Sequence, residues 1–295
     1  MDERVADLIY MQNNVYIDQK LKHLALALNT IIINKINCAV VNEQQKKIAF
    51  CTAIRDRFTS ISQTLPYNLL SLSENSFISI VDYGSSTDCF EKWLLANFKK
   101  SIETEKIIFF KVISDVDWSA PRAKNLAHRI AKADYYFNVD ADNFISHLDV
   151  SIIRHVSKRN IPCQQFLKNR DGTFGRIGLP SKTFFDIGGY DESMLPMGHQ
   201  DGDLLQRAIQ FHNGGFAKLS WNDAPRPIDR NISKLQAFSM PEENNWEKIN
   251  FVNMLHAHWR NKLMGIKIKD SFSTFEGYLN GKRVVIDGLN NIYSL

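Results

Sequence analysis

Four apolar segments alternate with helical patterns between residues 47 and 142, and this alternation constrains the fold more than any other feature of the chain. The segments typical of buried strands are KIAFCTAI (47–54), SFISIVDYGSSTD (76–88), KIIFFKVI (106–113) and YYFNVDAD (135–142). The segments with helical character between them are TSISQTLPYNLLSL (59–72) and APRAKNLAHRIAKA (120–133). This order predicts an α/β fold with a mostly parallel sheet that is flanked by helices on both faces.

Length and composition favour one globular domain. The chain has 295 residues, of which 44% are hydrophobic and 23% charged, so it can bury a large core. It contains no internal repeat, low-complexity segment or Pro/Gly-rich linker. Near Lys47 the residue pattern changes from helical spacing to the first apolar strand segment. We therefore predict a helical extension over residues 1–45 and a single α/β domain over residues 46–295.

The predicted extension contains the most apolar stretch of the chain, LKHLALALNTIIINKI (21–36), which is too short to cross a bilayer. A helix with one apolar face is predicted by the spacing of Ile17, Leu21, Leu24, Leu28 and Ile31. This face could dock on the domain or lie on a membrane surface, so both alternatives stay open. The first residues contain no basic segment followed by an apolar block, so we expect no secretory signal and a cytoplasmic location, with possible contact to the inner face of the membrane.

The charged residues and the cysteines narrow the class of ligand. The net charge is +4, and the basic residues are scattered, which weakly favours an anionic ligand and argues against a nucleic-acid partner. The four cysteines are far apart and lack the spacing of a zinc site. Buried free thiols in a reducing compartment are therefore expected for Cys38, Cys51, Cys89 and Cys163.

Polar residues follow three of the predicted strands at the point where each strand ends. They are Arg55 with Asp56, Asp82, and Asp140 with Asp142. The carboxyl ends of parallel strands meet at one edge of a sheet, where ligands of such folds bind. Two aspartates one residue apart repel each other, so Asp140 and Asp142 require a cation or several hydrogen-bond donors.

An Asp-x-Asp pair is not specific by itself. The chain has two more, Asp115 with Asp117 and Asp201 with Asp203. The second of these begins a predicted helix, where the aspartates could serve only as helix caps favoured by the helix dipole.

Five motifs, taken in order, resemble family 2 glycosyltransferases with the GT-A fold, in particular the galactosyltransferase and chondroitin-polymerase-like branch. The motifs are VDYGSSTD, PRAKNLA, ADYYFNVDAD, FFDIGGYDES and GHQDGDLLQR, within about residues 47–211. The resemblance implies an inverting hexosyltransferase that moves a sugar from a UDP-sugar to a hydroxyl of a glycan or lipid-linked saccharide, for example in polysaccharide biosynthesis. It also implies that residues 46–295 form the catalytic domain.

The resemblance implies roles for individual residues. Asp82 is similar to the acid that recognises the uracil or ribose, with Arg122 lining the same pocket. Asp140 and Asp142 match the pair that binds the metal and the diphosphate, and Asp201 matches the general base. Further roles are expected for Arg55 at the donor, for His199 and Gln200 at the acceptor, and for a metal-binding histidine, His258 ahead of His256. The family usually has Glu where this chain has Gln200, which cannot carry that charge.

The chemistry suits these residue types. A nucleoside diphosphate gains negative charge as it leaves, and carboxylates can hold the Mn²⁺ or Mg²⁺ that neutralises this charge. One base and an in-line displacement imply inversion. A nucleotidyltransferase that forms nucleotide sugars is a second hypothesis, although CTAIRDRF (51–58) lacks the glycine-rich phosphate loop of that class. An inactive carbohydrate-binding domain, with Gln200 as the sign of lost activity, is a third.

Overall fold

The computed structural model describes residues 46–113, 116–166, 172–219, 224–228, 246–268 and 272–295. Contacts within the chain divide it into two units, Met1–Gln45 and Lys46–Leu295. The predicted helical extension, with its apolar face, and Asp115 lie outside the described residues. The extension and its boundary therefore stay a prediction.

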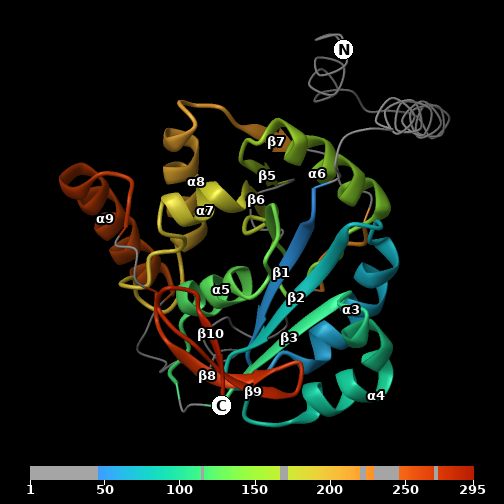
Figure 1. Cartoon of the computed structure of the whole chain (residues 1–295). Coiled ribbons are helices and arrows are strands. Elements are labelled where there is room, and N and C mark those ends of the chain that lie inside the picture. The colour runs from blue at the N-terminus through green and yellow to red at the C-terminus, as the bar shows by residue number, and fades with distance from the viewer. Residues whose placement is uncertain (1–45, 114–115, 167–171, 220–223, 229–245, 269–271) are drawn as a thin grey trace, which may run out of the picture. The chain divides into compact units, whose positions relative to one another are not determined.

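A ten-stranded sheet of order β10-β9-β8-β3-β2-β1-β4-β6-β5-β7 crosses this unit (Figure 1). The strands are β1 (Ile48–Ile54), β2 (Ser76–Asp82), β3 (Ile107–Val112), β4 (Tyr135–Asn138), β5 (Cys163–Gln165), β6 (Ile177–Pro180), β7 (Ala217–Leu219), β8 (Phe275–Leu279), β9 (Lys282–Ile286) and β10 (Ile292–Ser294). The four strands predicted from the apolar segments are all present, and β1 lies between β2 and β4 at the centre.

The sheet is parallel at its centre and mixed at its sides. β1 pairs in parallel with β2 and β4, and β2 pairs in parallel with β3, as predicted. β6 and β8 then join antiparallel to β4 and β3, so the sheet as a whole is less parallel than the apolar segments indicate. Beyond β8 the sheet continues through a β8–β9 hairpin, whose two-residue turn, Asn280–Gly281, has positive φ at both positions. Asn-Gly is the preferred sequence for such a turn.

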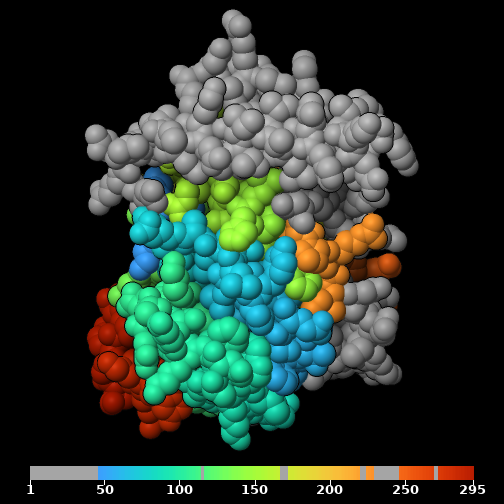
Figure 2. All heavy atoms as spheres, turned by 90° about the vertical axis from the view of Figure 1, so that its right-hand side faces the viewer, coloured from blue at the N-terminus to red at the C-terminus, as the bar shows by residue number. Residues whose placement is uncertain are grey.

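Helices cover both faces of the sheet. On one face lie α3 (Phe58–Ser71), α4 (Cys89–Glu103) and α6 (His147–Arg159), and Figure 2 shows this side of the molecule. On the other face lie α5 (Ala120–Arg129), α7 (Ser181–Asp186) and α8 (Gln200–Phe211). Alternate residues of β1 serve the two layers, since Phe50 packs with the first group and Cys51 with the second. The expected α/β architecture is thereby confirmed.

Helix α5 lies close to β1 and β2 because its inner residues are small. Ala123 and Ala127 are buried, and the Ser79 hydroxyl of β2 donates a hydrogen bond of 2.7 Å to the carbonyl oxygen of Ala127. Ser119 caps the start of the helix, and Pro121 occupies its first turn, where a missing N–H costs nothing. The helix therefore begins near the carboxyl ends of the central strands, with Lys124 one turn from its start.

The described cysteines are free, but they are not all buried. Cys51 and Cys163 are buried, whereas Cys89 is exposed at the start of α4, so the expectation of buried thiols is wrong for Cys89. Cys38 lies outside the described residues. None of the helices in the described part of the chain is both long enough and apolar enough to cross a membrane.

Candidate functional site

The carboxyl ends of β1, β2 and β4 bring the predicted polar residues to one edge of the sheet. The parallel register pairs Ile54 with Asp82 and Cys51 with Asn138, so the residues that follow these strands emerge on the same side. The backbone of Tyr83 donates to the carbonyl of Ile54, which extends the β1–β2 pairing past the last paired residues. Loops after the three strands therefore share one edge, as the sequence predicts.

Asp82 is the most enclosed acid at this edge. Its side chain is fully buried, and its Oδ1 accepts a hydrogen bond of 3.0 Å from the backbone N–H of Ser85. Within the described residues no donor reaches Oδ2, which is also buried. Burial raises the pKa of Asp82, although the hydrogen bonds of Ser85 oppose this shift. An unsatisfied buried carboxylate oxygen is costly and marks a position where a ligand N–H or O–H would bind.

Arg55 and Arg122 both lie close enough to Tyr83 for their charges to act on its pKa. The Arg55 guanidinium donates from Nη1 to the Val116 carbonyl at 2.8 Å, and no described group accepts from its buried Nε. Arg122 is exposed in the first turn of α5. Burial raises the pKa of Tyr83 to about 12, and the charges of Arg122 and Arg55 oppose that shift. Two cations thus lie near the buried Tyr83, which directly follows Asp82 in the chain, while the charge that most affects Asp82 itself is that of Lys111.

Asp140 and Asp142 follow β4 but face different surroundings. Asp142 is buried, and its Oδ1 accepts a hydrogen bond of 2.8 Å from the side chain of Asn143. The backbone N–H of Ile228 donates to the carbonyl of Asp142 at 2.9 Å, which places residues 224–228 against this loop. Asp140 is more open, and Asn138 donates to its Oδ1 at 3.3 Å.

Lys124 joins Asp140 to Asp201, and this contact is the main feature that the sequence analysis missed. The ammonium group lies 3.3 Å from Oδ1 of Asp140 and 2.8 Å from Oδ1 of Asp201. The exposed fractions of the three side chains are 9% for Lys124, 14% for Asp201 and 31% for Asp140. The ammonium of α5 thus links the end of β4 to the start of α8, across about sixty positions of sequence.

The protonation of this group follows from burial and charge. Burial alone would lower the pKa of Lys124, but Asp140 and Asp201 together raise it, so the ammonium form persists. Burial raises the pKa of Asp201, Lys124 opposes the shift, and the like charge of Asp140 adds to it. Asp201 is therefore a carboxylate with a stronger affinity for a proton than an exposed aspartate has.

The backbone of Gly175 closes over the three charged groups. A β-carbon at Gly175 would lie 3.0 Å from Oδ2 of Asp140, 3.2 Å from Oδ2 of Asp201 and 3.3 Å from the Lys124 nitrogen. Asn138 donates to the Gly175 carbonyl at 2.9 Å and so holds this backbone in place. A side chain here would displace the charged groups, which explains a glycine at this position.

The start of α8 shows that Asp201 and Asp203 are not helix caps. The first-turn acids follow His199, which has φ 61° and makes no side-chain capping hydrogen bond. Asp201 contacts Lys124, whereas the fully buried Asp203 accepts from Arg207 Nε at 2.9 Å and also pairs with Arg260. Asp203 is thus part of a buried ion-pair network, and only Asp201 reaches the sheet edge.

His199 and Gln200 lie beside Asp201. His199 is half-buried, and burial lowers its pKa, which Asp203 partly opposes. Gln200 donates from Nε2 to Oδ2 of Asp201 at 3.3 Å, and its buried Oε1 accepts no hydrogen bond from the described residues. The amide therefore keeps one acceptor available for a ligand hydroxyl.

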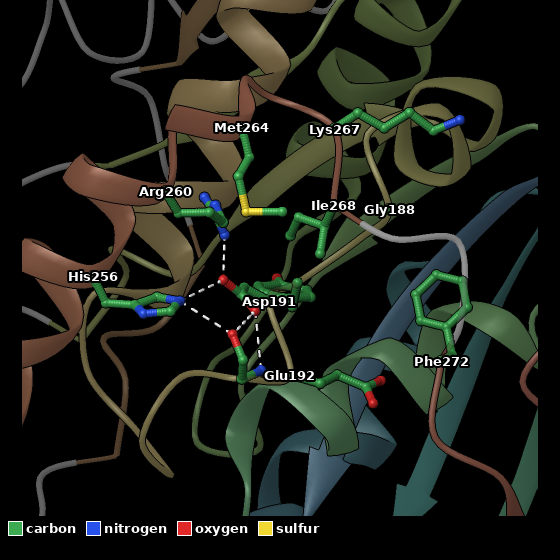
Figure 3. Close-up of a pocket in the computed structure, with 11 residues that line it drawn as sticks. Gly188, Asp191, Glu192, His256, Arg260, Met264, Lys267, Ile268 and Phe272 are labelled. Atoms are coloured by element: carbon green, nitrogen blue, oxygen red, sulfur yellow. Dashed lines mark hydrogen bonds and ion pairs between the residues drawn. The ribbon is translucent and has the colours of Figure 1, made fainter. Parts of the chain in front are cut away.

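Helix α9 (Trp246–Met264) carries both candidate histidines, and neither joins Asp140 and Asp142. His258 is exposed and packs against the edge of Trp259. His256 forms a hydrogen bond of 3.0 Å with Oδ2 of Asp191, and Arg260 contacts the same oxygen. The three side chains line a cavity of about 280 Å³ (Figure 3). In the described part of the chain, no three His, Cys, Asp or Glu side chains form a group that could hold a metal ion.

The comparisons with known proteins identify the fold. No family model matches the sequence, and no curated protein matches it. S. aureus TarS 1–349, solved in complex with UDP-GlcNAc, is similar with a TM-score of 0.51 and 12% identity. That match covers 64% of this chain and 60% of the TarS chain, so this chain spans less than two thirds of it.

A second similar structure is mannosyltransferase PcManGT from Pyrobaculum calidifontis, solved in complex with GDP-Man and Mn²⁺. Its TM-score is 0.50 at 11% identity, and the match covers 83% of this chain and 81% of that one. At these identities the similarity concerns the fold alone. The fold is a mixed α/β domain with a large central sheet flanked by helices, of the GT-A type predicted from the sequence motifs.

The ion contacts of Lys124 predict a coupling that denaturation can measure. Lys124→Met leaves Asp140 and Asp201 facing each other without the ammonium, so we expect the free energy of unfolding to fall by about 3 kcal/mol at neutral pH. Adding Asp201→Asn removes one of the two carboxylates and should restore a large part of that loss. Urea denaturation of the wild type, both single variants and the double variant measures the coupling energy between Lys124 and Asp201. Strictly additive losses in the free energy of unfolding would contradict the coupling.

Proposed function

We propose that this protein is a metal-dependent, inverting glycosyltransferase that moves a sugar from a UDP-sugar to a hydroxyl group of a glycan or lipid-linked saccharide. The observation that carries the proposal is the link from Asp140 through Lys124 to Asp201, at the sheet edge where Asp82 also ends a strand. The GT-A fold supports it, because it is the fold of a mannosyltransferase solved with a nucleotide sugar.

Asp82 is assigned to the nucleoside. Its unsatisfied Oδ2 can accept from the N–H of uracil or from a ribose hydroxyl, which would satisfy the buried oxygen. Positive charge for the diphosphate comes from Arg55, whose Nε is also unsatisfied, and from the exposed Arg122. Both arginines act on Tyr83, which directly follows Asp82. These three residues define the donor half of the site.

Asp140 and Asp142 are assigned to a divalent cation. Two carboxylates one residue apart offer the hard oxygen ligands that Mn²⁺ and Mg²⁺ prefer, and these ions commonly complete their shell with water and phosphate oxygens. These two carboxylates would hold the ion without a third protein ligand, so the ion would compete with Lys124 for Asp140, and His258, which is exposed on α9, takes no part. When bound, the ion supplies charge neutralisation for the leaving diphosphate.

Asp201 is assigned as the general base that accepts the proton of the acceptor hydroxyl. Its raised pKa increases its affinity for that proton, and Lys124 fixes the direction of its carboxylate at 2.8 Å. A base opposite the leaving group implies a single displacement and inversion at the anomeric carbon. Asn would keep the size of this side chain and remove its basicity.

Gln200 and His199 are assigned to the acceptor. The free Oε1 of Gln200 can accept from a second acceptor hydroxyl, while its Nε2 bonds to Asp201. The neutral amide of Gln200 lacks the negative charge of a glutamate at this position, but its oxygen can still accept a hydrogen bond from a sugar hydroxyl. Gln200 therefore fits an active site that binds a neutral saccharide hydroxyl, and it does not by itself indicate an inactive domain.

The assignment of Asp142 predicts how UDP binds. We expect Asp142→Ala to remove the increase in UDP affinity that Mn²⁺ gives the wild type, because the variant lacks one of two metal ligands. Calorimetric titration of UDP with and without Mn²⁺ measures this difference. Asp115→Asn, in another Asp-x-Asp pair, is the matched control and should bind as the wild type does. Equal UDP affinity with and without Mn²⁺ in the wild type would overturn the metal assignment.

The assignment of Asp201 predicts a separate effect on rate. We expect Asp201→Asn to lower the transfer rate roughly 10²–10⁴-fold while UDP affinity in Mn²⁺ stays near that of the wild type. Transfer assayed by UDP release over a panel of UDP-sugars measures the first quantity. Loss of UDP binding in this variant would place Asp201 at the donor instead, and a normal transfer rate would remove it from the mechanism.

A further inference from the structure

Helix α9 turns two polar side chains inward besides two apolar ones. Asn253 and Arg260 are buried on its inner side together with Ile249 and Ala257. The amide of Asn253 donates to the carbonyls of Met197 and Gly198 at 3.1 and 2.8 Å, and its oxygen accepts from the N–H of Leu195 at 2.9 Å. Arg260 pairs with two buried aspartates, Asp191 and Asp203. Because these bonds are specific in direction, they fix the rotation of α9 about its axis.

The outward side of α9 carries several large apolar side chains. A row at four-residue spacing consists of Phe251, Leu255, Trp259 and Leu263, whose exposed fractions are 53, 40, 53 and 77%. Val252, Met254 and Met264 on the same helix are exposed as well. In the part of the chain that the structure describes, seven of the eighteen exposed large hydrophobic side chains lie on this one helix, which is at the edge of the domain (Figure 1). Exposed apolar patches of this kind mark interaction surfaces.

Basic residues accompany the apolar row. Lys248 and Lys262 lie one turn from members of the row, and both are exposed, as is Lys267 just after the helix. The Lys262 ammonium lies 5.3 Å from the ring centre of Trp259. The only acid in α9 is Glu247 at its first turn. Aromatic and aliphatic residues with lysines on one helix face are typical of helices that lie in the interface of an anionic membrane.

We propose that the outward face of α9 binds the surface of a bilayer containing anionic phospholipids, with the apolar row in the headgroup region and the lysines at the lipid phosphates. A second copy of this chain fits less well. Lysine is depleted from the cores of protein interfaces, and a two-fold contact centred on this face would bring Lys248 and Lys262 near lysines of the other copy. Anionic lipid instead satisfies both the apolar and the charged groups.

Flotation of the purified full chain with vesicles tests the proposal. We expect binding to phosphatidylcholine vesicles that contain phosphatidylglycerol, weaker binding to phosphatidylcholine alone, and loss of the difference at high salt. Trp259→Ser with Leu263→Ser should weaken binding to the anionic vesicles by at least roughly tenfold, because two large apolar side chains leave the interface. Lys248→Glu with Lys262→Glu should abolish the preference for anionic lipid.

The matched control is Leu70→Ser with Leu289→Ser, which removes two apolar side chains of similar exposure, 77 and 71%, from other elements. It should bind vesicles as the wild type does, and thermal melting of every variant checks that it is folded. Unchanged binding by the Trp259 and Leu263 variant would place the membrane contact elsewhere in the chain and refute the proposal. So would a lipid-free dimer that this variant disrupts. No sugar transfer is measured, so the result is independent of the proposed enzymatic activity.

Discussion

The contact of Lys124 with Asp140 and Asp201 is the interaction on which the candidate site depends. Three elements that are distant in sequence, α5, the end of β4 and the start of α8, meet through these side chains. Buried carboxylates are unfavourable unless they are paired, so the ammonium group makes their close approach possible. Ala123 and Ala127 let α5 pack closely on β1 and β2, and this packing determines how near Lys124 comes to the carboxyl ends of the strands. The chemistry at the sheet edge therefore rests on how closely one helix packs.

The sequence predicts the central strands well because their physics is local. Runs such as KIAFCTAI are buried on both faces of a parallel sheet and so show no alternation, and each ends where a polar residue reaches the edge. The positions of Asp82, Asp140 and Asp142 follow from this rule alone. The sequence also predicts that a helix begins near Asp201, but it does not predict the contact of Asp201 with Lys124.

Contacts between distant segments could not be predicted in this way. Lys124 looks like an ordinary helix residue in PRAKNLA, and only the packing of α5 against the sheet turns it toward Asp140. Gly175 carries no motif, and its role appears only when its backbone is seen beside the charged groups. The exposure of the apolar row of α9 could not be predicted either, because apolar residues at this spacing usually form the buried face of a helix. In the structure, Asn253 and Arg260 lie on the buried face and the row is exposed. The hairpin that joins β8 and β9 was not predicted, although its Asn280–Gly281 pair favours such a turn.

The central claim is that one sheet edge holds both the nucleotide and its metal. Crystals grown with UDP and Mn²⁺ test it directly, because anomalous scattering locates manganese without reference to the protein chain. The account predicts an anomalous peak within direct coordination distance of carboxylate oxygens of Asp140 or Asp142, with uracil or ribose at Asp82. Manganese at His256 and Asp191, or UDP bound away from Asp82, would contradict it.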